Sequence, residues 1–294
     1  MVVIKDKQLL YEHYWDGYSA KSKTNSFSMA KSFTSLCIGA AIKEGKIKNV
    51  DQKVGDFLPE FNEGVKSKVT IRHLLNMTSG IDFGESYGDP FGFMAKTYYG
   101  TDLYNLTVSK TVKYEPGTVW KYQGGNTLLL SFILKNATKK SLSNYFEEKF
   151  WQPIGATEDA LWTTDKKEGL ERSFCCFYSN AADYARIGQV LLDSGKWNSK
   201  QLIDQDFYLH SISPVEVNNS KGEMIDYYGY QWWIGNYKNT SFYYARGILG
   251  QYIVAIPEWN AVLVRLGHQR DQKRKAEIPS DLFSYLELAK QVCN

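Results

Sequence analysis

Ser28 and Lys31 form the only Ser-x-x-Lys pattern in this chain of 294 residues. Residues three apart on a helix share a face, so the Lys31 amine can reach the Ser28 hydroxyl. A serine hydroxyl is a weak nucleophile that needs a base, and a partly desolvated lysine can be that base or lower the pKa of a neighbouring phenol. In the first helical turn, Ser28 would also present backbone N–H groups to an oxyanion. The pattern indicates acyl transfer through Ser28, and the alternative is an ordinary solvated helix face.

The helix that must carry this pair is expected from about Ser28 to Glu44. Its apolar side chains recur at helical spacing, at Phe33, Leu36, Cys37, Ala40 and Ala41. Ile38 and Ile42 make the helix apolar on most sides, which predicts that it is buried. Gly45 follows at the position of a C-terminal cap.

Strand patterns lie near the two ends of the chain, and helical patterns lie between them. A hairpin is expected over 2–14, and later strands over 228–234, 241–245, 251–256 and 261–266. Helices are expected over 71–75, 142–150 and 181–192, capped by Thr70, Ser141 and Ser179, and from 280 to about 289.

This order of elements predicts an α/β (α+β) fold with a mainly antiparallel sheet flanked by helices. We expect residues 1–50 and 225–294 to form the sheet lobe and residues 51–224 to form an inserted, mostly helical lobe. An active site would then lie in the cleft between the two lobes.

The composition is that of a globular protein with a full core. Hydrophobic residues make up 43% of the chain and charged residues 23%, which excludes disorder for most of it. The net charge of +3 gives no general attraction to nucleic acid. No apolar run approaches the roughly 18 residues of a membrane helix, so we expect a soluble chain with no transmembrane segment.

Other residues that could do chemistry have simpler explanations. The segment Gly84–Gly88 fits the Gly-x-Ser-x-Gly elbow of α/β-hydrolases, but Asp89-Pro90 follows it and a loop is expected there. On a strand, Cys175 and Cys176 would point to opposite faces, which disfavours a shared metal. The same alternation predicts that one residue of Trp232-Trp233 faces the core and the other faces outward.

The segment Ser26–Ser35 resembles the nucleophile segment of the serine β-lactamase and penicillin-binding-protein superfamily. Further matching segments follow in the order of that superfamily, at Thr70–Ile81, at Glu115-Pro116-Gly117 with Tyr122, at Ala181–Gly188 and at Tyr228–Trp233. Within its class-C-like branch, Ala245–Gln251 is most similar to the esterases and aminohexanoate-oligomer hydrolases. The resemblance covers nearly the whole chain, and it implies the β-lactamase/transpeptidase-like fold.

The resemblance also implies roles for individual residues. Ser28 would form the acyl-enzyme, and Lys31 would hold the proton network. Tyr122, as phenolate or as hydrogen-bonded phenol, would be the general base. The backbone N–H groups of Ser28 and Ile248 would form the oxyanion hole.

Two motifs depart from the pattern of the superfamily. Tyr122-Gln123-Gly124 stands where a Tyr-x-Asn is usual, and either Gln123 or Asn126 could supply the missing amide. Ala245-Arg246-Gly247 stands where Lys-Thr-Gly is common, and Arg246 could replace the lysine charge. The candidate substrate-binding residues are therefore Gln123, Gly124, Asn126, Arg246 and Gly247.

These expectations favour a serine hydrolase that cleaves a small ester, amide or peptide-like molecule, with no cofactor and no metal. A β-lactamase or D-alanyl-D-alanine carboxypeptidase is one alternative. A catalytically weak penicillin-binding or sensor module is another, because the second motif is altered. Similar proteins are often exported, so we expect an extracytoplasmic location, with the signal segment absent from this sequence; the oligomeric state stays open.

Overall fold

A six-stranded antiparallel sheet joins the two ends of the chain in the computed structural model, which describes residues 1–15, 17–275 and 277–294. Its strands follow the order β10-β11-β12-β13-β1-β2. They span Trp233–Tyr237 (β10), Thr240–Gly247 (β11), Gln251–Ile256 (β12), Ala261–Arg265 (β13), Val2–Lys5 (β1) and Gln8–Glu12 (β2). The expected mixture of helices with a mainly antiparallel sheet is confirmed.

Helices cover both faces of this sheet. Every residue of β12 is buried, and its side chains alternate between two cores. Ile253 and Ala255 belong to the core that includes α7 (Ala181–Leu192), whereas Val254 and Ile256 belong to the core that includes α9 (Ser280–Cys293). A strand buried on both faces is a nearly continuous apolar run, as β12 is from Tyr252 to Ile256, and its expected span of Gln251–Ile256 is confirmed.

The remaining elements lie mostly between β2 and β10. The helices are α1 (Ala30–Lys43), α2 (Ile71–Leu75), α3 (Phe93–Tyr99), α4 (Leu103–Val108), α5 (Gly124–Thr138), α6 (Leu142–Phe146) and α8 (Gln205–Ser211). The 3₁₀ turns are η1 (Phe27–Met29), η2 (Val54–Asp56), η3 (Pro59–Phe61), η4 (Gly64–Lys68) and η6 (Pro257–Trp259), and η5 (Glu147–Trp151) is a π-helical turn. Two-residue and three-residue strands are β3 (Thr24–Asn25), β4 (Leu161–Trp162), β5 (Phe177–Ser179), β6 (Lys196–Trp197), β7 (Lys200–Gln201), β8 (Val217–Asn218), β9 (Met224–Ile225), β14 (Arg274–Lys275) and β15 (Ile278–Pro279).

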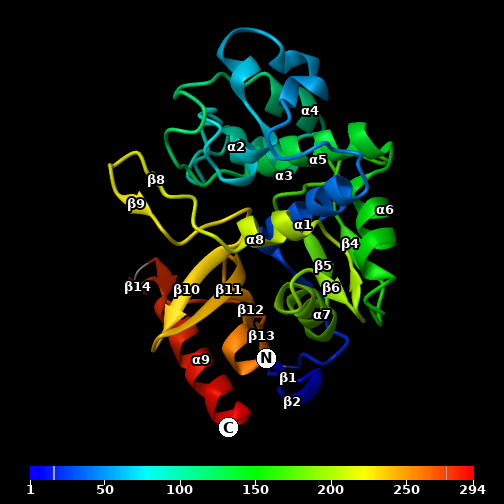
Figure 1. Cartoon of the computed structure of the whole chain (residues 1–294), viewed down its shortest axis with the longest axis vertical. Helices are drawn as coiled ribbons and strands as arrows, with labels where there is room; N and C mark the ends of the chain where they lie inside the picture. The colour runs from blue at the N-terminus through cyan, green and yellow to red at the C-terminus, as the bar shows by residue number, and fades with distance from the viewer. Residues whose placement is uncertain (16, 276) are drawn as a thin grey trace.

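Helix α1 lies in the middle of the molecule. Figure 1 shows α2 to α5 gathered at one end and the sheet with α7 and α9 at the other, with α1 between them. All of its residues from Ala30 to Ala41 are buried, as its apolar pattern predicts. The division of the chain into a sheet lobe and a helical lobe stays a prediction, since α7 comes from the segment 51–224 and yet packs on the sheet.

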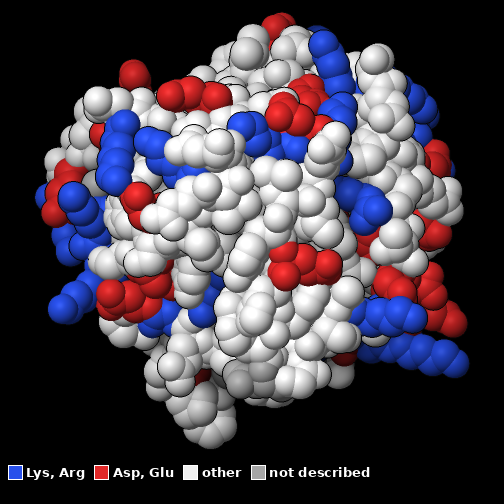
Figure 2. All heavy atoms as spheres, turned by 90° about the horizontal axis from the view of Figure 1, so that it is seen from below, with Lys and Arg blue, Asp and Glu red and all other residues white. Residues whose placement is uncertain are grey.

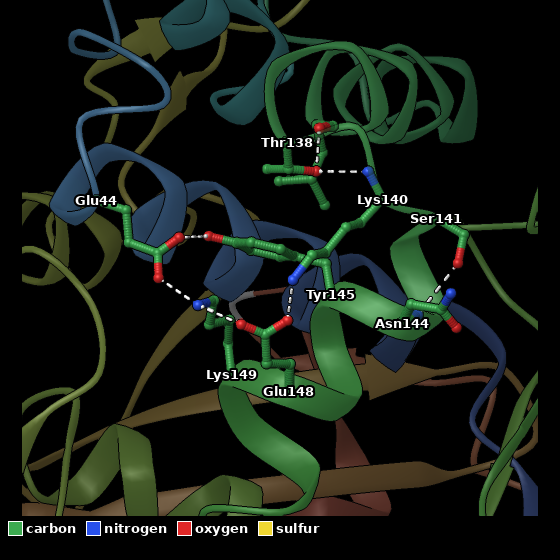
Figure 3. Close-up of polar contacts among 9 residues, drawn as sticks. Glu44, Thr138, Lys140, Ser141, Asn144, Tyr145, Glu148 and Lys149 are labelled. Carbon is green, nitrogen blue, oxygen red and sulfur yellow. Dashed lines mark hydrogen bonds and ion pairs between the residues drawn. The ribbon is translucent and has the colours of Figure 1, made fainter.

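The C-terminal end of α1 is tied to α6 and η5 by the polar network in Figure 3. Tyr145 donates a hydrogen bond of 2.9 Å to Glu44, the residue that follows α1. Lys149 pairs with the other oxygen of Glu44 and, at 2.8 Å, with Glu148. Glu148 also pairs with Lys140. Helix α1 is therefore fixed at the end opposite Ser28.

Two of the three expected caps are confirmed, and the third is wrong. The side chains of Thr70 and Ser141 accept hydrogen bonds from the first turns of α2 and α6. Helix α7 is capped by Asn180 instead of Ser179. Ser179 is the last residue of β5, where its backbone pairs with Thr24, so the helix cannot begin until the next residue.

The strand expected over 228–234 begins only at Trp233. Gln231 has a left-handed backbone, with φ of 64°, and its side-chain amide donates to the carbonyls of Leu74 and Leu75 at 3.0 and 3.1 Å. Gln231 is thus held to α2, and the backbone N–H of Gly229 donates to the carbonyl of Trp232 within the segment instead of to a neighbouring strand. Trp232 and Trp233 are both buried, so the expectation that one of them faces outward is wrong: Trp232 enters one core of the sheet and Trp233 the other.

Charges of both signs are mixed on the surface. Figure 2 shows Lys and Arg side chains next to Asp and Glu side chains around a broad uncharged area on the face seen from below. Among the described residues, no helix has both the length and the apolar character needed to cross a bilayer.

We predict that Phe33→Ala lowers the free energy of unfolding by about 3–5 kcal/mol, the usual cost of removing a buried aromatic ring. Phe33 is fully buried in α1, and its ring centroid lies 5.3–6.0 Å from those of Phe146, Phe177 and Tyr184. Urea unfolding measures the change. The control is Phe91→Ala, because Phe91 is 82% exposed and its loss should cost less than about 0.5 kcal/mol. Equal losses in the two variants would show that this packing is misplaced.

Candidate active site

The turn that carries Ser28 is tightly confined by the end of β11. Ser28 is the middle residue of η1, which leads directly into α1. The residue before it, Phe27, has a left-handed backbone, with φ of 44°. A Cβ atom on Gly247 would lie 2.4 Å from the backbone carbonyl oxygen of Ser26. Only glycine permits this approach, and it brings the C-terminal end of β11 next to Ser28.

Lys31 is buried with its amine beside the Ser28 hydroxyl. Its Nζ lies 3.0 Å from Ser28 Oγ and donates a second hydrogen bond of 3.0 Å to the carbonyl of Phe174. Burial lowers the pKa of Lys31 below its usual value of 10.5, because a desolvated ammonium is unfavourable. The site thus has a serine hydroxyl next to an amine that gives up its proton more easily than a surface lysine.

Tyr122 completes the group of three residues that the sequence analysis singled out. Its ring lies 4.9 Å from Lys31 Nζ, and both Tyr122 and Ser28 line the same cleft. Burial raises the pKa of Tyr122 to about 12, although the neighbouring Ser28 hydroxyl and the charge of Arg246 act in the opposite direction. Of the two forms that the sequence left open for Tyr122, this environment favours the hydrogen-bonded phenol over the phenolate.

The Phe174 carbonyl that receives Lys31 belongs to a turn closed by a disulfide between Cys175 and Cys176. Opposite faces were expected for these cysteines only on a strand, and that condition is not met. Strand β5 begins only at Phe177, and Cys176 has a left-handed backbone, with φ of 67°. This geometry brings the two neighbouring sulfur atoms together.

Three arginines lie on the sheet side of the site. The guanidinium of Arg246 stacks on the ring of Trp233 at 3.4 Å and donates to the carbonyl of Glu277 at 2.7 Å. Arg270 and Arg274 line the same cleft. Burial and the neighbouring charges of Arg246 and Arg274 lower the pKa of Arg270. Arg274 is paired with the Glu277 carboxylate at 2.7 Å, so the net positive charge of this group comes from Arg246 and Arg270 and is suited to an anionic group of a ligand.

These groups enclose a cleft of about 260 Å³. The predicted residues that line it are Ser28, Lys31, Tyr122, Gly124, Arg246, Gly247 and Ile248. Apolar surface comes from Met94, Phe174 and Trp233. Within residues 1–15, 17–275 and 277–294, no three His, Cys, Asp or Glu side chains are grouped so that they could hold a metal ion.

Two predicted substrate-binding residues, Gln123 and Asn126, are buried outside the lining of this cleft. The Asn126 amide accepts a hydrogen bond of 2.6 Å from Ser79 and donates to the sulfur of Met77 at 3.4 Å. Because its polar atoms are already used, the structure does not support a role for Asn126 in place of the missing asparagine. Gln123 is 2% exposed and does not reach the cleft either.

Glu85 is a cleft residue that sequence reasoning missed. It belongs to the segment Gly84–Gly88, which is an exposed loop and no elbow. Its carboxylate accepts hydrogen bonds of 2.8 Å from the backbone N–H groups of both Gly124 and Gly125. The available signal was the Gly124-Gly125 pair, which opens a helix with no side chain of its own to cap it.

Comparison with known proteins gives a consistent result. A family model described as "Beta-lactamase" matches residues 1–283. The 6-aminohexanoate-dimer hydrolase of Paenarthrobacter ureafaciens is 26% identical over 294 residues, which cover 92% of this chain and 72% of that protein. Penicillin-binding protein 4* of Bacillus subtilis is 27% identical over 269 residues, covering 78% of this chain and 57% of the relative.

The fold is shared with solved structures. A structure from Bacillus anthracis, described as a candidate 6-aminohexanoate-dimer hydrolase, superposes with a TM-score of 0.82 at 24% identity. The match covers 99% of this chain and 77% of that chain. At this level of identity the likeness shows a common fold.

Proposed function

Since the chain belongs to the Beta-lactamase family, we propose that it is a serine hydrolase that cleaves a small ester or amide through an acyl-enzyme on Ser28. The observation that carries this proposal is the buried amine of Lys31, 3.0 Å from Ser28 Oγ at the wall of a cleft. The related hydrolase from Paenarthrobacter acts, by its name, on a dimer of 6-aminohexanoate, which is a small linear amide. A substrate of similar size would fit a cleft of about 260 Å³.

In this proposal Lys31 is the group that takes the proton of Ser28. Its lowered pKa makes the neutral amine available at a lower pH than for a surface lysine. As Ser28 Oγ bonds to the substrate carbonyl carbon, the hydroxyl proton moves to Lys31 Nζ. Tyr122, a phenol with a pKa of about 12, gives its proton to the leaving group and regains one from Lys31. Water then attacks the acyl carbon by the same route, and Ser28 Oγ is released as a hydroxyl.

The developing oxyanion would be bound by the backbone N–H groups of Ser28 and Ile248. Both residues line the cleft, and Ser28 also lies at the positive end of α1. The close approach of Gly247 to Ser26 keeps these two segments together. Fixed donors of this kind are usually the largest electrostatic contribution to acyl transfer.

Arg246, Arg270 and Arg274 would bind an anionic group of the substrate. They lie together on the side of the cleft that β11 and the segment before β15 provide. We therefore infer that the preferred ester or amide carries a carboxylate. This inference assigns to Arg246 the charge that the usual third motif supplies with a lysine.

We predict that Ser28→Ala abolishes covalent labelling by a fluorophosphonate and leaves the fold intact. Ser28 is only partly buried and makes no side-chain cap to α1, so the change should cost at most about 1 kcal/mol. Intact-protein mass spectrometry measures the adduct, and thermal unfolding checks the fold. Ser86→Ala, which changes an exposed loop serine, should label like the unmodified protein. An adduct that persists in Ser28→Ala, or one mapped to Ser86, would contradict the assignment.

We also predict that short p-nitrophenyl esters are cleaved faster than nitrocefin. Gly124 brings no amide to the cleft, and Ala245-Arg246 replaces the usual Lys-Thr pair. Values of kcat/KM for p-nitrophenyl butyrate, p-nitrophenyl hemisuccinate and nitrocefin make the comparison, and the carboxylate of the hemisuccinate should raise its value above that of the butyrate. Nitrocefin turnover faster than that of either ester would favour the β-lactamase alternative.

The pH dependence of acylation distinguishes Lys31 from Tyr122 as the base. Because the pKa of Lys31 is lowered, its neutral amine forms below pH 10.5, so the acylation rate should rise with pH and level off below that value. The rate should then stay level up to the pKa of Tyr122, about 12, because Tyr122 remains a phenol there. Stopped-flow bursts with a p-nitrophenyl ester measure this rate. Lys31→Ala and Tyr122→Phe should each lower it by roughly 10²–10⁴, and the double variant hardly further. A rate that still rises above pH 10.5 would identify the phenolate as the base.

A further inference from the structure

Glu85 is the one acidic side chain among the described residues that line the cleft. The other charged side chains there are cations, Lys31, Arg246, Arg270 and Arg274. Arg274 is paired with Glu277 at 2.7 Å, so the Glu85 carboxylate faces an excess of positive charge from the three other cations and strongly affects the local electrostatic potential. The reaction proposed above gives Glu85 no part, so its presence in the cleft has no explanation yet.

The Glu85 carboxylate is fixed by the first turn of α5. Its two oxygens accept hydrogen bonds of 2.8 Å, one from the N–H of Gly124 and one from the N–H of Gly125. Gln123, the residue at the N-cap of α5, gives no side-chain hydrogen bond to this turn. A negative charge at a helix N-terminus is stabilised by the N–H groups and the helix dipole. Glu85 therefore caps α5 from a loop that lies 39 residues earlier in the sequence.

The two glycines make this contact possible. A Cβ atom on Gly125 would lie 2.2 Å from the ring of Phe83, and one on Gly124 would lie 3.1 Å from the side chain of Phe174. A side chain at residue 125 would push Phe83, and with it the loop, away from α5, whereas one at residue 124 would press on Phe174. The sequence Gly124-Gly125 and the residues Phe83 and Glu85 therefore fit one another as a unit.

We propose that Glu85 is a positioning residue for the acyl transfer assigned to Ser28. Its carboxylate fixes the start of α5, two residues after Tyr122, and its negative charge favours the proton on the Lys31–Tyr122 pair. This inference rests on the proposed function. Residue 124 is a glycine and has no polar side chain to offer the cleft. In this proposal the Glu85 carboxylate, from the loop before α3, is the polar group at that position.

The charges around Glu85 determine the sign of its effect. Lys31 of α1 and Lys121, just before α5, face it as cations, and the hydroxyls of Tyr87, Tyr98 and Tyr122 face it as acids. The negative charge of Glu85 raises the pKa of both Lys31 and Tyr122. Removing that charge must lower both pKa values, so the free base should appear at lower pH and be weaker.

The test is the pH profile of kcat/KM for a p-nitrophenyl ester in Glu85→Gln. This variant keeps the size of the side chain and removes its charge. We expect the acid limb of the profile to move about one pH unit lower, as for the loss of a nearby charge. The plateau should fall roughly tenfold, since a weaker base transfers the proton less well. Thermal unfolding checks each variant, and Glu85→Ala replaces Glu85→Gln in the same comparison if the glutamine variant does not fold.

Two further variants separate charge from structure. Asp82→Asn removes a carboxylate three residues away on the same loop, where Asp82 pairs with Lys121 at the surface at 3.3 Å; it should leave the acid limb in place. Glu85→Asp keeps the charge with a shorter reach, and it should restore the acid limb of the unmodified protein. A limb displaced equally in Glu85→Asp and Glu85→Gln would overturn the proposal.

A uniform loss of rate at every pH in Glu85→Gln would show that the residue is only structural and would also overturn the proposal. Ser28→Ala distinguishes this failure from a failure of the proposed function. If Ser28→Ala is inactive while Glu85→Gln has the profile of the unmodified protein, the inference about Glu85 alone is wrong. If Ser28→Ala acylates normally, the proposed function is wrong and the inference fails with it.

Discussion

Burial of the Lys31 amine is the constraint around which the site is built. An amine that is 2% exposed needs hydrogen-bond partners, because an unpaired polar group inside a protein costs several kcal/mol. Its two partners are Ser28 Oγ, one turn earlier on the same segment, and the Phe174 carbonyl from a turn far along the chain. The second partner requires that turn to lie against α1, and the disulfide between Cys175 and Cys176 closes it there.

Other polar residues of α1 bind distant segments in the same way. Ser32, Thr34 and Ser35 are buried, and each donates a hydrogen bond to a backbone carbonyl. The acceptors are Gln231, Ser173 and Tyr230 respectively. Buried hydroxyl groups must be paired, so the chain on either side of the cleft is held to the helix that begins after Ser28. The polar residues of an otherwise apolar helix thus select which segments surround it.

Much of the fold follows from local patterns in the sequence. Strand β12 is apolar from Tyr252 to Ile256 and is followed by a Pro257-Glu258-Trp259-Asn260 turn, and both of its ends agree with the expectation. Helix α1 was predictable because its apolar residues and Gly45 agree on one span. Asn180 was not distinguishable from Ser179 as a cap, because both residue types cap helices well and only the pairing of β5 decides between them. The segment before Trp233 is apolar like a strand, but hydrogen bonds of Gln231 to α2 override that pattern.

The residues of the site also divide into those that local sequence predicts and those that distant contacts decide. Ser28, Lys31 and Tyr122 were predictable from spacing and from resemblance, and the structure brings them together. Glu85, Arg270 and Arg274 were not, because they lie in segments without periodicity and their positions depend on contacts far away in sequence. Gln123 and Asn126 were plausible by proximity to Tyr122, yet the helix that begins at Gly124 turns both side chains into the interior. At the start of this helix, closeness in sequence to Tyr122 did not predict which side chains reach the cleft.

The position of β1 within the sheet has a consequence for how the protein is made. Val2 pairs with Val264, and Lys5 donates a hydrogen bond to the carbonyl of Cys293, so β1 can enter the sheet only after strand β13, more than 250 residues later, has been synthesised. Until then the hairpin of β1 and β2 has an open edge, and contacts this distant in sequence form slowly. Strand β11, whose end borders the cleft, belongs to the same late-closing sheet. A nascent or prematurely terminated chain would therefore carry Ser28 and Lys31 without a complete cleft, and it would need protection from aggregation before it could do any chemistry.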